Sequence, residues 1–145
     1  MSTALEHAHT PVADHRSGRA GAVRRFVGGF YLFTAGVNAG MALADPEVYR
    51  EFASEAFFSF VTNAWQDVVM SHPVPWFAAL AAGELVLGLL LLRGGLAARV
   101  GWAGVLAFQV LLMLFGFGFW MWSLPVLAVL VPVVWRDWPR LQQER

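Results

Sequence analysis

The sequence has 145 residues, of which 58% are hydrophobic and 14% are charged, and its formal net charge is zero. Soluble domains usually carry about 25% charged residues, and a small domain cannot bury so much apolar surface, whereas a lipid bilayer can cover it. The zero net charge gives no indication of nucleic-acid binding. Because the chain has no cysteine, it cannot form disulfides, thiol redox centres or thiolate metal sites. All its basic residues are arginine, which suggests a GC-rich bacterial genome.

Residues 1–25 are polar and have no apolar period, so we expect a disordered cytoplasmic tail. His7, His9 and His15 could hold a metal ion together with Asp14. Mobile tails with histidines are common, and we therefore predict no metal site here.

The first apolar run, residues 26–44, follows Arg24 and Arg25. A twin-arginine signal peptide cleaved after Ala44 is an alternative, but the run is longer than the usual signal core and further apolar runs follow, so we predict a first membrane span.

The two sides of this first span differ in character. At about 100° per residue, Tyr31, Thr34 and Asn38 fall on one face, which we expect to point inward. Small residues form the opposite face, and they include a GxxxG pair: Gly29, Gly36 and Gly40. This face predicts helix packing, either within the chain, which we favour, or against a second copy of it.

Residues 45–71 form an amphipathic segment between the first and second spans. Asp45-Pro46-Glu47 is a helix start, and apolar or small pairs then recur every four residues. A strict four-residue step drifts by about 40° per repeat around a 3.6-residue helix. We therefore predict two shorter amphipathic helices with a bend near residues 58–63, lying on the outer membrane surface and capping the bundle. We favour a lid over a gate for this segment.

Three further spans follow. Residues 74–92 would reach roughly 28 Å as a helix, close to the thickness of the hydrocarbon core, and they contain Glu84 near their middle. The uncharged run that starts at Val100 is long enough for two spans joined at Gly116-Phe117-Gly118, which gives spans over 100–117 and 119–138. Residues 139–145 form a second cytoplasmic tail. The predicted fold is all-α, a bundle of four transmembrane helices.

The placement of arginine predicts the orientation of this bundle. With four spans, every arginine except Arg50 lies on the side of the two termini, and Arg50 lies among acidic residues on the other side. Positively charged residues mark the cytoplasmic side, so we expect both termini in the cytoplasm and a multi-pass protein of the bacterial inner membrane.

Polar residues from three spans fall at similar depth. We predict that Glu84 shares a hydrogen-bonded cluster with Gln109, Asn38 and Thr34, because each polar group in hydrocarbon needs a partner. No arginine lies at that depth, so we expect Glu84 to be protonated at neutral pH and to donate to Gln109, Asn38 or a carbonyl. A register-locking acid and a ligand-binding or proton-carrying acid, with Tyr31, Gln109, Asn38 and Thr34 as further candidates, both remain open.

The segment Glu84-Leu85-Val86-Leu87-Gly88-Leu89-Leu90-Leu91-Leu92, followed by Gly94, Gly95 and Arg99, resembles the second span of the DoxX-like membrane family. Arg25, Gly29 and Gly36 resemble the opening helix of that family. The resemblance implies a four-helix membrane bundle, and some members are subunits of thiosulfate:quinone oxidoreductase or partners of membrane redox complexes. Of the candidate site residues, it extends to Glu84 alone.

From these observations we expect a component of a membrane assembly, organised around the buried acid, that is either non-catalytic or in contact with quinone or lipid. We expect no catalytic residue, no metal and no cofactor in the chain itself, with quinone as a candidate ligand and the lipid bilayer as its surroundings. A membrane subunit of a quinone-linked oxidoreductase and an oligomeric carrier or channel for a small solute are the alternatives. Each would need a partner, a redox subunit or a second copy of the chain.

Overall fold

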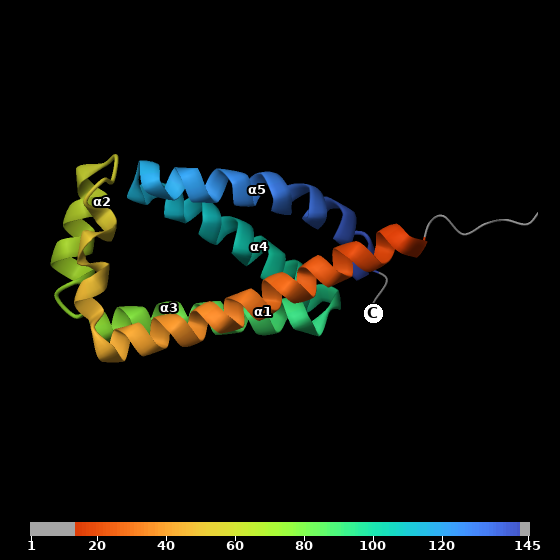
Figure 1. Cartoon of the computed structure of the whole chain (residues 1–145), viewed down its shortest axis with the longest axis horizontal. Helices are drawn as coiled ribbons and strands as arrows, with labels where there is room; N and C mark the ends of the chain where they lie inside the picture. The colour runs from red at the N-terminus through yellow and green to blue at the C-terminus, as the bar shows by residue number, and fades with distance from the viewer. Residues whose placement is uncertain (1–13, 143–145) are drawn as a thin grey trace, which may run out of the picture.

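The computed structural model describes residues 14–142, and within that range the chain is helical with no strand (Figure 1). Four long α-helices are joined by short helical turns and by a capping segment. In chain order the elements are α1 (Asp14–Ala44), η1 (Pro46–Ala53), α2 (Ser59–Ala64), η2 (Trp65–Val69), α3 (Pro73–Arg93), α4 (Gly95–Leu112), η3 (Met113–Phe115), α5 (Phe117–Asp137) and η4 (Arg140–Gln142).

Four stretches are long and apolar enough to cross a membrane: Gly18–Ala44 within α1, Pro73–Arg93, Gly95–Phe115 and Phe117–Asp137. Most of their residues are not buried inside the bundle, and large apolar side chains such as Phe26 and Trp135 are exposed on its outside. An apolar exterior of this kind suits lipid rather than water. The all-α bundle with four candidate spans is therefore confirmed.

The first helix begins earlier than the sequence indicated. We expected a disordered tail through Arg25, but α1 starts at Asp14. The prediction relied on the absence of an apolar period in this segment. The helix is held instead by tertiary contacts, since Ala20 is buried and Arg24 reaches the Asp137 carboxylate of α5. The side chains of His7, His9, Asp14 and His15, where we predicted no metal site, fall outside those that the structure describes.

Helices α1 and α3 lie side by side along one edge of the molecule, α5 forms the opposite edge, and α4 runs obliquely between them (Figure 1). Glycines bring α1 and α3 close together. A Cβ atom on Gly88 would lie 2.8 Å from the carbonyl oxygen of Gly28, and one on Gly28 would lie 3.1 Å from the carbonyl oxygen of Gly88. These two glycines let the backbones approach.

The glycines predicted to pack helices are different ones, and within the chain that prediction is wrong. Added Cβ atoms at Gly29, Gly36 and Gly40 would meet nothing within 4 Å among the described residues. The face of α1 that carries Tyr31 and Gly28 turns toward the other helices instead. The GxxxG stripe is left on the outer surface of the bundle.

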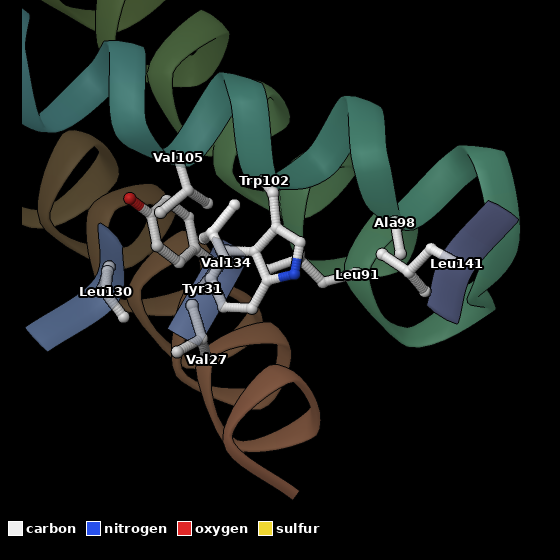
Figure 2. Close-up of a cluster of buried hydrophobic side chains, with 9 residues drawn as sticks. All are labelled: Val27, Tyr31, Leu91, Ala98, Trp102, Val105, Leu130, Val134 and Leu141. Carbon is white, nitrogen blue, oxygen red and sulfur yellow. The ribbon is translucent and has the colours of Figure 1, made fainter. Parts of the chain in front are cut away.

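The main core lies where α1, α4 and α5 converge. The fully buried Trp102 of α4 packs among Val27 and Tyr31 of α1 and Val134 of α5 (Figure 2). Its indole Nε1 donates a hydrogen bond of 3.0 Å to Oδ2 of Asp137.

That carboxylate joins three helices. Arg24 Nε lies 3.8 Å from Asp137 Oδ2, and Asp137 is only 3% exposed. Beside this group, the Arg99 guanidinium lies 4.6 Å from the centre of the Trp138 ring, a cation–π contact. The sequence analysis assigned Asp137 no role. Its contacts with Arg24 and Trp102 tie the end of α5 to α1 and α4.

The capping segment closes the other end of the bundle (Figure 1). As expected, it consists of two helical pieces, and the Asp45 side chain caps the first by accepting from the Glu47 amide. The first piece is a 3₁₀ helix, and the break lies at residues 54–58 rather than near 58–63. Within this break the backbone carbonyl of Glu55 packs against Gly116 at the α4–α5 turn. Gly116 has φ +109, so this glycine is required both by the turn and by the contact.

Side chains of the second piece satisfy the backbone of the first. Trp65 Nε1 donates to the carbonyl of Tyr49 at 2.9 Å, Gln66 Nε2 to that of Arg50 at 2.9 Å, and Thr62 Oγ1 to that of Ala53 at 3.0 Å. The two pieces are therefore fastened to each other as one cap.

Candidate functional site

Glu84, at the middle of α3, accepts the first of two linked hydrogen bonds that together join α3, α1 and the cap. Asn38 Nδ2 of α1 donates to Glu84 Oε2 at 2.7 Å, and the Tyr49 hydroxyl of η1 donates to Asn38 Oδ1 at 2.5 Å. Glu84 is 6% exposed. In this contact the carboxyl group accepts, and its protonation at neutral pH stays a prediction.

Thr34, one turn before Asn38 on α1, completes the surroundings of the acid. Its side chain lies next to the Glu84 carboxyl group, and its hydroxyl donates to the backbone carbonyl of Tyr31 at 3.1 Å. Tyr31 is buried, while Thr34 and Asn38 are partly buried. The predicted inward face of the first span is thus confirmed.

The sequence analysis did not include Tyr49 in the cluster. Its ring stacks on Phe77 with 4.0 Å between the ring centres. Burial raises the pKa of the Tyr49 hydroxyl above its ordinary value of 10.0, and the nearby Glu84 carboxylate raises it further. The four-residue pattern places Tyr49 on the inward stripe of the cap, but the pattern alone does not show that its hydroxyl reaches Asn38.

Gln109 is not among the hydrogen-bond partners of Glu84 within the described residues, contrary to the single cluster that we expected. The Gln109 side chain of α4 lies beside the Tyr31 hydroxyl instead. Within the described residues, neither Tyr31 Oη nor Gln109 Oε1 has a hydrogen-bond partner of good geometry, although both atoms are buried. Equal depth along two helices did not bring the side chains together, because α4 runs obliquely across the bundle. The polar layer is therefore divided into a Glu84 cluster and a Tyr31–Gln109 pair.

Each part of the polar layer borders a cavity. The first, which we call the aromatic cavity, has a volume of about 270 Å³ and lies beneath the cap. Its lining comes from the cap and from all four long helices and consists of Asn38, Tyr49, Phe52, Trp65, Phe77, Leu80, Glu84, Phe108, Leu112, Phe115 and Phe119. Glu84 is the acidic group of this lining.

The second cavity, which we call the membrane groove, has a volume of about 430 Å³ and lies between α1 and α5. Apart from the Tyr31–Gln109 pair and the edge of one indole, its lining is apolar. The full lining is Phe26, Val27, Phe30, Tyr31, Gln109, Trp122, Pro125, Val126, Val129 and Leu130. Several of these side chains, among them Phe26 and Val129, also face the exterior of the bundle. The groove therefore borders the surface that lipid would cover.

No known family model, curated protein or solved structure matches this chain. The site must therefore be interpreted from its own geometry.

Proposed function

We propose that this chain is a non-catalytic integral membrane protein that binds a lipid-soluble molecule with a polar head, of the quinone class, in the membrane groove. The observation that carries the proposal is the Tyr31–Gln109 pair. Both residues line an otherwise mainly apolar groove and lie beside each other, and within the described residues the buried Tyr31 hydroxyl and Gln109 Oε1 have no hydrogen bond of good geometry. A buried polar group without a hydrogen bond costs about 1–3 kcal/mol, and a ligand that supplies the bond recovers that energy.

The chemistry of the pair indicates the head group. The Tyr31 hydroxyl can donate a hydrogen bond, and Gln109 Oε1 can accept one. The carbonyl of a quinone would accept from Tyr31, and the hydroxyl of the reduced quinol would in addition donate to Gln109. The ring and tail of such a molecule would lie along apolar side chains such as Val126 and Val129. The hydroxyl of a lipid offers the same chemistry and is the competing source.

The proposed membrane and orientation of the chain follow from the distribution of its arginines. The arginine distribution supports a bacterial inner-membrane protein with both termini in the cytoplasm. The resemblance to DoxX-like proteins supports membership of a larger membrane assembly, in which a partner would carry any redox chemistry. The groove favours this function over a solute carrier, because its lining is mainly apolar.

Tryptophan fluorescence tests the proposal, since Trp122 lines the groove and quinones quench indole emission. Decylubiquinone is titrated into the full chain in detergent micelles. We expect a saturable quenching component that disappears in the Tyr31→Phe/Gln109→Leu double variant and in Trp122→Phe. It should persist in Trp135→Phe, which removes a lipid-facing indole remote from the groove.

Identical quenching of the wild-type chain and the double variant would overturn the proposal, provided that far-UV circular dichroism shows both to be folded. Native mass spectrometry of the same samples separates the two sources of ligand. A retained adduct with the mass of the quinone supports the proposal, whereas retention of phospholipid that decylubiquinone does not displace shows a lipid site instead.

A further inference from the structure

The walls of the aromatic cavity are unusually rich in rings that contact one another. They come from the cap, α3, the α4–α5 turn and α5, and they are Tyr49, Phe52, Trp65, Phe77, Phe115 and Phe119.

Consecutive ring contacts link these walls to one another. The Tyr49 and Phe52 ring centres are 5.0 Å apart, and those of Trp65 and Phe115 are 5.1 Å apart. Phe119 closes the sequence, with its ring centre 5.7 Å from those of both Phe52 and Phe115. The π faces of aromatic rings carry a negative potential that attracts cations.

Glu84 adds an acid to this cavity for which the described residues supply no cation. Among residues 18–142, Glu84 has no ion-pair partner, and its neighbours Asn38, Thr34 and Tyr49 are neutral. Arg50, the arginine of the cap, is occupied elsewhere, since its guanidinium contacts Glu47 at 2.6 Å and Gln66 at 3.3 Å. We therefore expect Glu84 to carry a proton while the cavity is empty and to release it when a cation binds, because an ionised carboxylate in such a place is costly unless a positive charge accompanies it.

We propose that the aromatic cavity is a binding site for a small organic cation of the quaternary ammonium class, with Glu84 as its counter-ion and the surrounding rings as its cage.

The dimensions and donor groups favour this class over other cations. A metal ion would need several oxygen ligands at once, and the cavity offers Glu84 with the amide of Asn38, which already bonds to Glu84 and Tyr49. A primary ammonium group would need three acceptors, which a wall made of rings does not supply. A quaternary ammonium group has no N–H to satisfy, and its charge is spread over methyl groups that pack against rings. The volume of about 270 Å³ suits a molecule of several heavy atoms rather than a bare ion.

Choline and 3,3-dimethyl-1-butanol test this assignment directly, because they share one shape and differ in the positive charge. Binding to the full chain in neutral detergent is measured by isothermal titration calorimetry. We expect choline to bind at least roughly tenfold more tightly than its neutral isostere, since both the acid and the rings act on the charge. Equal affinities, or no choline binding at millimolar concentrations, would overturn the assignment.

Two variants separate the acid from the rings. Glu84→Gln keeps the size of the side chain and should weaken choline binding roughly tenfold or more, while Phe119→Leu keeps an apolar wall without its π face and should weaken it severalfold. The matched control is Glu55→Gln, which neutralises an exposed acid of the cap and should leave the affinity unchanged. Wild-type affinity in both Glu84→Gln and Phe119→Leu would overturn the proposal. It is independent of quinone binding, because it uses a different cavity, probe and set of variants.

Discussion

Replacing Gly88 with alanine should weaken the contact between α1 and α3, and Gly36→Ala supplies the matched control. The added methyl group at position 88 would lie 2.8 Å from the Gly28 carbonyl oxygen and 2.8 Å from Cδ2 of Leu32. The Leu32 side chain can rotate away, but the Gly28 carbonyl belongs to the backbone of α1, so the helices must separate by several tenths of an ångström. Overpacking of this kind costs about 1–3 kcal/mol.

The Gly36→Ala control accounts for the change in helix propensity that both substitutions bring. Alanine is favoured over glycine in a helix by up to about 1 kcal/mol, and both positions lie within long helices. A methyl group at Gly36 meets nothing within 4 Å, so Gly36→Ala changes helix propensity alone. The difference in unfolding free energy between the two variants should therefore be about 1–3 kcal/mol, with Gly88→Ala the less stable.

The assay is unfolding of the detergent-solubilised chain by increasing mole fractions of sodium dodecyl sulfate, followed by far-UV circular dichroism. Equal midpoints for Gly88→Ala and Gly36→Ala would refute the close α1–α3 contact. The measurement is repeated over a range of protein concentrations. If Gly36 lies in a contact between two copies, the stability of Gly36→Ala relative to the wild type will depend on concentration.

Three further predictions concern the polar groups. Tyr49→Phe should cost about 1 kcal/mol in the same unfolding assay, because Asn38 loses its donor, and an unchanged midpoint would contradict that hydrogen bond. Asp137→Ala should lower the unfolding free energy by about 1–3 kcal/mol, because the Trp102 N–H loses its acceptor. Trp102→Phe should destabilise the Asp137→Ala variant less than it destabilises the wild type, and equal losses in the two backgrounds would refute the pairing. In Tyr31→Phe, which leaves one tyrosine, ultraviolet absorbance should show Tyr49 ionising above pH 10.0, because burial raises its pKa. Its folded-state pKa lies above the unfolded value, so the stability it contributes is present below pH 10.0 and is lost as the pH rises through the folded pKa; ionisation at or below pH 10.0 would contradict this.

The spans could be predicted from the sequence because apolar length is a local property. The runs around Glu84 and on either side of Gly116 have the length of a bilayer crossing, and each became a helix. The inward face of α1 was equally local, since Tyr31 and Asn38 follow the helical period. The beginning of α1 could not be predicted, because it depends on contacts with other helices: Ala20 is buried and Arg24 contacts Asp137.

Side-chain partners depended on how the helices cross, which the sequence does not show. Depth along each span suggested that Gln109 would meet Glu84, but the oblique path of α4 places Gln109 beside Tyr31. Glycine spacing suggested that Gly36 packs a helix, but the rotation of α1 selects Gly28 instead. The two cavities arise between elements distant in the sequence, and no single segment predicts them.

The central claim is that the chain crosses the membrane four times, with the cap on one side and the two termini on the other. The chain has no cysteine, so Glu55→Cys in the cap and Gln142→Cys near the end of the chain each introduce a single exposed thiol. In intact bacterial cells, a membrane-impermeant maleimide should label the Glu55→Cys variant at once and the Gln142→Cys variant only after permeabilisation. Labelling of Gln142→Cys alone would reverse the proposed orientation, and equal labelling of both variants in intact cells would contradict the four crossings.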